Sequence, residues 1–286
     1  MSDSRESVTG QCIAEFLGTG LFMFFGTSVL CAAKLAGASF GLWEICIVWG
    51  LGIALAVYLT AGISGAHLNP AVTIALWMFA RFEAKKVAPY ILAQMAGAFC
   101  GAALTYLLYH NLFADYEQAH QMVRGSQDSL YLASIFSTYP AASISVWLAA
   151  LVEIVITSML IGLIMALTDD GNGVPKGPLA PLLIGLLVAV IGAATAPLTG
   201  FAMNPARDFG PKLFTFLNGW GSVAMTGGRE IPYFLVPLIA PVIGGILGAA
   251  IYRYGIGRPL PPAGVAGPTP PPPTPPRRRR VIRCPD

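Results

Sequence analysis

The chain has 286 residues, of which 55% are hydrophobic and only 11% are charged. Soluble domains carry about 25% charged residues, so this composition excludes an ordinary water-soluble domain and indicates a membrane protein. The formal net charge of +3 includes arginines near the C-terminus, at 277–280 and 283. A charge concentrated in one terminal segment gives no sign of nucleic-acid binding.

Six apolar segments are each long enough to cross about 30 Å of hydrocarbon as a helix. In chain order they lie at about 11–34, 41–61, 86–110, 145–167, 179–198 and 232–254. The first is too long for the apolar region of a signal peptide, and residues 1–9 before it lack a basic head, so we expect it to be retained. The sequence predicts an all-α membrane protein with six transmembrane helices.

Two shorter apolar segments each begin with the same tripeptide. It occurs as Asn69-Pro70-Ala71 and again as Asn204-Pro205-Ala206. Asn is a preferred N-cap, and Pro suits the first helical position because its missing N–H would have been unpaired there. The apolar runs at 71–80 and 209–217 are about half the roughly 20 residues of a full span, so we predict two half-helices. Such a pair indicates an inverted repeat with a site at the middle of the membrane.

Three spans and one half-helix in each half define the predicted organisation. Residues 11–258 form one membrane domain, with repeat one at about 11–110 and repeat two at about 145–254. Lys and Arg are more frequent on the side that holds both ends, which predicts a cytoplasmic N-terminus, 1–10, and a cytoplasmic C-terminus. The Pro- and Arg-rich tail, 259–286, is predicted to be disordered. Contact of its arginines with anionic lipid is an alternative to a silent tail.

Two carboxylates lie near the start of the first span of each half, at Glu15 and Glu153. A proton relay is one interpretation. The favoured one is structural, in which each carboxylate accepts hydrogen bonds from the irregular backbone before a half-helix, because that backbone needs partners at membrane depth. Too few other acidic groups line the spans to form a relay chain.

Arg207 follows the second tripeptide and lies in the first turn of the predicted half-helix. A cation there opposes the helix dipole, whose N-terminal end is already positive. A role in a polar pore is therefore favoured, since a guanidinium offers several donors and repels cations. The alternative is a surface salt bridge with the adjacent Asp208.

The remaining reactive side chains predict no chemistry. The cysteines and two of the histidines lack the paired spacing of metal ligands: Cys12, Cys31, Cys46, Cys100, Cys284, His110 and His120. The acidic segment 169–173 lacks the spaced ligands of a calcium loop. We expect both histidines at the end of the third span and in the loop after it. Neither a cofactor, a metal site nor an enzyme is expected.

The chain resembles the aquaporin and aquaglyceroporin family, and within it the bacterial glycerol-conducting members. The resemblance covers about residues 10–258 and is strongest at 10–20, 64–73 and 198–212. It implies the aquaporin-like fold, with half-helices that meet at their N-termini and direct Asn69 and Asn204 into one channel. It also implies a homotetramer, and pore-lining carbonyls at Gly65, Ala66, His67, Gly200, Phe201 and Ala202.

In that family a narrow ring on the outer side selects among solutes, and the matching positions here are Trp49, Gly192, Phe201 and Arg207. Water-selective members place His where this chain has Gly192, so the resemblance implies a wider ring. Trp49 and Phe201 would present an apolar corner opposite the Arg207 donors, which suits glycerol. Asp208 is expected to support the ring without touching the solute.

The sequence therefore predicts a passive channel for glycerol and related small uncharged solutes, with some water, that excludes ions and protons. Its expected place is a bacterial-type inner membrane, and its partners are the solutes, water and the lipid bilayer. Three alternatives are a water channel with incidental polyol leakage, a transporter coupled to protons through Glu15 or Glu153, and a junction-forming relative with a closed pore.

Overall fold

The computed structural model describes residues 7–172 and 177–257. Six helices within these ranges are long and apolar enough to cross a membrane, which confirms the predicted spans. They are α1 (Val8–Leu35), α2 (Leu42–Ser64), α4 (Ala84–Ala119), α6 (Val146–Thr168), α7 (Ala180–Thr199) and α10 (Leu235–Ile251), the last continued by the π-helical turn η5 (Tyr252–Ile256). The predicted tail, 259–286, lies outside the described residues.

Both predicted half-helices are present, as α3 (Pro70–Phe79) and α8 (Pro205–Thr215). Each begins with the expected Pro after an Asn N-cap, so the second one starts earlier than its apolar run at 209–217. The short connecting elements are η1 (Gln127–Ser129), α5 (Leu130–Ala133), η2 (Asp170–Asn172), η3 (Gly177–Leu179), η4 (Phe216–Trp220) and α9 (Ser222–Thr226).

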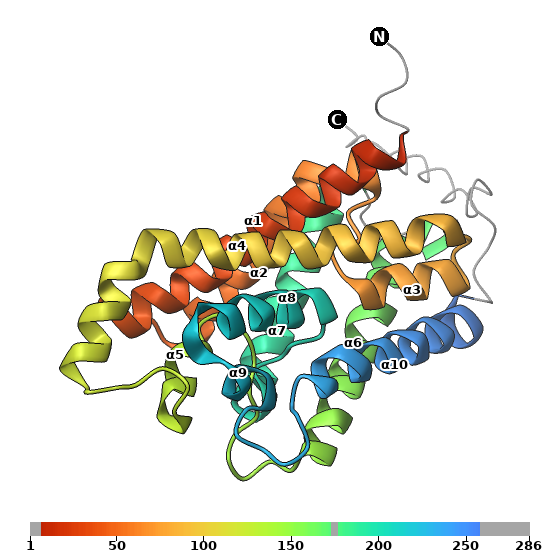
Figure 1. Cartoon of the computed structure of the whole chain (residues 1–286). Helices are drawn as coiled ribbons and strands as arrows, with labels where there is room; N and C mark the ends of the chain where they lie inside the picture. The colour runs from red at the N-terminus through yellow and green to blue at the C-terminus, as the bar shows by residue number, and fades with distance from the viewer. Residues whose placement is uncertain (1–6, 173–176, 258–286) are drawn as a thin grey trace, which may run out of the picture.

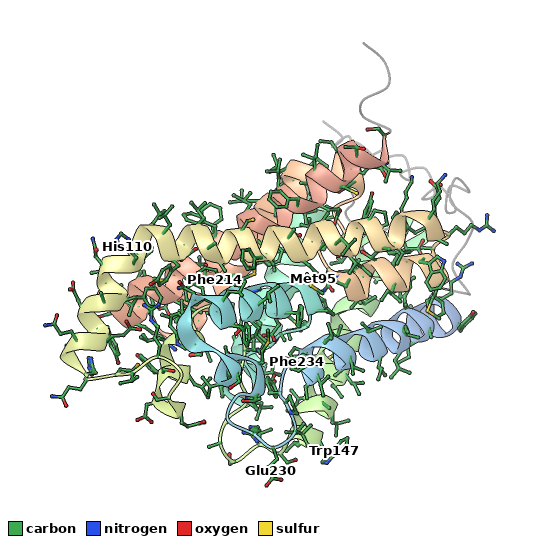
Figure 2. All side chains as sticks on the ribbon, in the orientation of Figure 1. Met95, His110, Trp147, Phe214, Glu230 and Phe234 are labelled. Carbon is green, nitrogen blue, oxygen red and sulfur yellow. The ribbon has the colours of Figure 1, made fainter. Side chains whose placement is uncertain are left out.

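Helix α4 is longer than the apolar pattern indicated, because it continues to Ala119. Its last turns carry aromatic side chains that pack on the segment between α4 and α6: the Phe113 ring stacks on Phe136 with centroids 5.5 Å apart. His110, expected at the end of the span, is therefore inside the helix and exposed (Figure 2). Packing after the apolar segment, and not hydropathy, sets the end of α4.

The helices pack in pairs that match between the two repeats. Helix α1 packs on α4, and α6 packs on α10 in the same way, while α2 and α7 cross each other. The half-helices α8 and α3 follow one another beneath the long α4 (Figure 1). Each half-helix also packs on the last span of the opposite repeat, α8 on α4 and α3 on α10. The two repeats are therefore interlocked.

Glycines allow these pairs to approach closely. Two glycines of α4 and two of α10 face the partner helix, and a Cβ atom on any of them would lie far inside contact distance of a backbone oxygen there. The distances would be 2.3 Å from Gly97 to Phe16 O, 2.6 Å from Gly101 to Gly20 O, 2.3 Å from Gly244 to Ile154 O and 2.1 Å from Gly248 to Ser158 O. The spacing at 97/101 and 244/248 thus serves packing inside the bundle.

Asp169, directly after α6, makes two hydrogen bonds. Asp169 Oδ1 accepts a hydrogen bond from the Gly171 N–H at 2.7 Å, and the Tyr252 hydroxyl donates to Asp169 Oδ2 at 2.9 Å. Among the residues that the structure describes, no group of three His, Cys, Asp or Glu side chains is placed to hold a metal ion.

We expect Gly248→Ala to destabilise the protein, because the new methyl group meets the Ser158 backbone, which cannot yield as a flexible side chain does. Overpacking of this kind costs about 1 to 3 kcal/mol. Gly62→Ala is the matched control, since that helical glycine has no atom within 4 Å of its would-be Cβ. Thermal unfolding of the detergent-solubilised variants measures both, and equal midpoints would contradict this account of the α6–α10 contact.

Candidate functional site

The two segments that precede the half-helices share one unusual backbone conformation. The φ angle is +83° at Gly65, +50° at Ala66 and +52° at Leu68, and it is +81° at Gly200, +46° at Phe201 and +51° at Met203. Left-handed φ at a non-glycine residue costs about 1 to 3 kcal/mol and persists only where the surroundings hold it. Four such residues at matching positions indicate a functional constraint on the backbone.

Glu15 holds the first of these segments. Its Oε1 accepts from the Ser64 hydroxyl at 2.6 Å and the His67 N–H at 2.9 Å. Its Oε2 accepts from the Leu68 N–H at 2.6 Å and the Gln94 amide at 2.7 Å. The side chain is fully buried, and a buried carboxylate with several donors forms strong, charge-assisted hydrogen bonds. The non-helical backbone is thus paired within the protein.

Glu153 holds the second segment through the same geometry. Its Oε1 accepts from the Thr199 hydroxyl at 2.7 Å and the Ala202 N–H at 2.9 Å, and its Oε2 accepts from the Met203 N–H at 2.8 Å. It is also fully buried. Both carboxylates direct their oxygens at backbone N–H groups, as the structural interpretation of the sequence expects.

The two asparagines are joined across the repeats. Asn69 Nδ2 donates to the Met203 carbonyl at 2.9 Å, and Asn204 Nδ2 donates to the Leu68 carbonyl at 2.8 Å. Their Oδ1 atoms cap the half-helices, accepting from Ala71 N at 2.8 Å and from Ala206 N at 2.9 Å. A carboxamide nitrogen carries two hydrogens, so each asparagine keeps one N–H beyond the hydrogen bond described here.

A cavity of about 460 Å³ runs past both asparagines, and most of the predicted site residues line it. These are Trp49, Gly65, Ala66, His67, Asn69, Phe201, Ala202, Asn204 and Arg207. One side is formed by the two held segments, whose carbonyls at 65–67 and 200–202 accept no hydrogen bond from any described residue. The other side is apolar, with Phe22, Ile53, Val57, Leu160 and Val188. The lumen is therefore amphipathic along its length.

The remaining predicted residues lie behind this wall. Pro70, Ala71, Pro205 and Ala206 form the buried first turns of α3 and α8, where they contribute backbone to the helix N-termini. Gly200 lies against Thr138, to which a Cβ would approach within 3.1 Å. The two N-termini face each other across the asparagines, so two positive dipole ends act on the same point of the cavity.

Three of the four predicted ring residues contact one another. The Arg207 guanidinium carbon lies 4.2 Å from the Trp49 ring centroid, and the Trp49 and Phe201 rings meet edge to face at 6.5 Å. Arg207 Nη1 donates to the Phe136 carbonyl at 3.1 Å, which fixes the guanidinium from the loop between α5 and α6. The result is an apolar corner beside a row of free N–H donors.

Gly192, the fourth predicted ring residue, acts indirectly. A Cβ there would lie 2.9 Å from Phe201 Cε2 and 3.0 Å from the Cys46 sulfur. The space left by the missing side chain is therefore filled by the Phe201 ring, and Gly192 does not itself line the cavity. The sequence interpretation that Gly192 leaves open space in the ring is wrong in this detail. The Phe201 side chain packs directly against the Gly192 backbone and occupies that space.

Asp208 makes a buried ion pair, and the alternative of a surface salt bridge with Arg207 is wrong. Asp208 Oδ2 accepts from Lys212 Nζ at 2.6 Å, and both side chains are fully buried. Asp208 Oδ1 accepts from the N–H and the hydroxyl of Thr138, at 2.6 and 2.7 Å, while Lys212 donates to the Thr138 carbonyl. The pair thus holds the loop between α5 and α6, which presents the Phe136 carbonyl to Arg207.

Two tyrosines outside the spans lie beside Lys212 of this pair. Lys212 Nζ lies 4.3 Å from the Tyr139 ring centroid and 5.5 Å from that of Tyr233. Burial raises the pKa of both phenols above the ordinary value, so they remain neutral and present their faces to the cation. Sequence reasoning found neither these residues nor Gln94, Phe136 and Thr138, since they lie outside any motif and act through contacts distant in the chain.

Comparisons with known proteins place the chain in a defined group. The family model described as Major intrinsic protein matches residues 2–252. The propanediol uptake facilitator PduF of Citrobacter freundii is 76% identical over 90% of this chain and 96% of its own length. The glycerol uptake facilitator protein of Escherichia coli strain K12 is 68% identical over 89% of this chain and 91% of its own length.

A solved structure agrees with the fold. The aquaglyceroporin from Plasmodium falciparum superposes with a TM-score of 0.77 at 31% sequence identity. The match covers 87% of this chain and 97% of that one. The arrangement of six spans and two half-helices is therefore that of this group of proteins, as the sequence predicted.

We expect Glu153→Gln to lower both stability and solute flux. The carboxamide keeps the shape but turns an N–H₂ group toward a backbone N–H, so at least one buried donor loses its acceptor, at about 1 to 3 kcal/mol. Glu230→Gln, at an exposed loop position (Figure 2), is the control. Thermal unfolding and vesicle flux are the measurements, and a Glu153→Gln protein that matches the control in both would show that the carboxylate charge is not needed.

Proposed function

This chain belongs to the major intrinsic protein family, and on that premise we propose that it is a passive channel for glycerol and related small uncharged solutes. The relatives at 68% and 76% identity carry the names glycerol uptake facilitator and propanediol uptake facilitator. Both solutes are short polyols with a carbon skeleton on one side and hydroxyls on the other. Water is expected to pass with them.

The observation that carries the proposal is the ring at the outer end of the cavity. Trp49 and Phe201 meet edge to face, and the Arg207 guanidinium lies beside them with N–H groups not used by the Phe136 carbonyl. A polyol can rest its CH groups on the two aromatic rings while its hydroxyls accept from the guanidinium. A cationic solute finds no counter-ion among these ring residues, and Arg207 repels it.

The rest of the cavity replaces the water that a polyol leaves behind. An unpaired hydroxyl costs about 1 to 3 kcal/mol by protein measures, so each must find a partner along the path. Asn69 and Asn204 supply donors, and the unpaired carbonyls at 65–67 and 200–202 supply acceptors. Such single contacts are weak enough for release, as conduction requires.

Exclusion of ions and protons follows from the same elements. Two helix N-termini, each equivalent to about half a positive charge, meet at the asparagines. Arg207 adds a full positive charge at the ring. Both asparagine side chains are fixed as donors toward the lumen because their oxygens cap the half-helices. A chain of waters cannot then keep one orientation through the midplane, which disfavours proton transfer.

Several features of the assembly belong to the proposal. A homotetramer with one pore per subunit is expected, and so are the bacterial inner membrane and a cytoplasmic position for both termini. In this organisation residues 1–10 and 259–286 flank one channel domain, 11–258, made of the two repeats. No cofactor is needed, since the solute moves down its own gradient.

The alternatives differ in testable ways. A water channel would need a narrower, more polar ring than one walled by Trp49 and Phe201. A proton-coupled transporter would need Glu15 or Glu153 to change protonation, whereas each holds two backbone N–H groups. A junction-forming relative with a closed pore would conduct neither glycerol nor water. The observed ring and cavity favour the glycerol channel over all three.

Reswelling of vesicles tests the proposed function. Liposomes that contain the purified protein are mixed with a hyperosmotic glycerol solution, so that water leaves them first. A sucrose solution of equal osmolarity measures the water flow alone. We expect shrinkage followed by rapid reswelling in glycerol, with no ion gradient present. Glycerol entry no faster than in empty liposomes, together with rapid shrinkage in sucrose, would make the protein a water channel.

The ring assignment predicts the effect of a paired exchange. In Gly192→His/Phe201→Ala the smaller residue makes room for the imidazole, which then narrows the ring and removes its apolar corner. We expect the glycerol-to-water permeability ratio to fall about tenfold or more. Phe201→Ala alone, which only widens the ring, is the control and should keep glycerol flux. An unchanged ratio in the double variant would contradict the placement of the ring.

A further inference from the structure

Trp49, the largest residue of the ring, lies directly on a glycine of the first helix. A Cβ atom built on Gly26 of α1 would be 2.3 Å from Trp49 Cδ2, 2.3 Å from Cε3 and 2.4 Å from Cε2. These three atoms belong to the six-membered ring, and their near-equal distances place the α1 backbone over the face of that ring. No rotation of the indole in its own plane could make room for a side chain.

The indole is also confined on the side of the lumen. The Arg207 guanidinium carbon is 4.2 Å from the ring centroid, and the Phe201 ring meets Trp49 at 80°. Only 2% of the Trp49 surface is exposed. The indole therefore has one position, between the α1 backbone and the solute path. Any atom added at position 26 acts on the width of that path.

The same design appears behind the second aromatic residue. A Cβ atom built on Gly192 would lie 2.9 Å from the Phe201 ring. This contact is looser than the 2.3 Å between a Cβ atom on Gly26 and the Trp49 ring. Each aromatic wall of the ring thus rests on a glycine of a different helix, α1 for Trp49 and α7 for Phe201. Of the two, Gly26 allows less movement.

We propose that Gly26 is a specificity-determining position, because its missing side chain sets the depth of the Trp49 indole and so the width of the ring available to a polyol. Gly26 touches no solute and acts only through Trp49, as a positioning residue. The inference rests on the proposed function, since it concerns the same ring. It states that a polyol can pass beside Trp49 only when position 26 is glycine.

The test is Gly26→Ala, which adds a single methyl group in the middle of a helix. Alanine is a better helix former than glycine, so the substitution does not weaken the helical backbone of α1 itself. The methyl group must push the indole toward the lumen. We expect the glycerol-to-water permeability ratio in liposomes to fall about tenfold, because a polyol fills the ring more completely than water does.

Rescue distinguishes positioning from general damage. Trp49→Ala removes the whole indole that lies over Gly26, so Gly26→Ala/Trp49→Ala should show the same ratio as Trp49→Ala alone. Gly62→Ala, a helical glycine with nothing within 4 Å, is the matched control for the methyl group and should leave the ratio unchanged. If the single variant does not fold, recovery of folding and flux in the double variant supports the inference equally.

The outcomes separate the inference from the proposed function. Wild-type protein that admits glycerol no faster than empty liposomes contradicts the proposed function. Wild-type protein that conducts glycerol, with a Gly26→Ala ratio equal to that of Gly62→Ala, overturns the inference alone. A ratio that is lower in Gly26→Ala/Trp49→Ala than in Trp49→Ala also overturns it, because the damage would then have a cause other than the indole.

Discussion

Two buried carboxylates support a backbone that lipid would otherwise forbid. Residues 65–68 and 200–203 cannot be helical if their carbonyls are to face a solute, yet their N–H groups have no water to bind at that depth. Glu15 and Glu153 accept those N–H groups on one side, which frees the carbonyls on the other. The left-handed residues before each half-helix are held by these carboxylate contacts.

The ring depends on a second layer in the same way. Arg207 is fixed by the Phe136 carbonyl, and the segment that carries this carbonyl is held at Thr138 by Asp208 and Lys212. The aromatic rings rest on backbone where two helices carry no side chain. The residues that position the ring come from α1, α7, α8 and the loop between α5 and α6.

The sequence predicts the parts of this structure that local chemistry determines. Hydropathy predicts the six spans, and Asn followed by Pro predicts the starts of α3 and α8. Hydropathy missed the end of α4, because Phe113 is held by Phe136 and not by lipid. The seat of Phe201 on Gly192 and the loop contact of Arg207 were also missed, since both join residues far apart in the chain that no spacing rule connects.

The crossed amide contacts have a consequence for how the protein comes into being. Asn69 finds its carbonyl partner at Met203, and Asn204 finds its own at Leu68. During synthesis the first half of the polypeptide enters the bilayer with an amide that has no native partner until the second half has followed it. A single repeat therefore lacks the acceptor for its own asparagine amide. An ancestor of half this length would have had to pair with an inverted copy of itself before it could conduct anything.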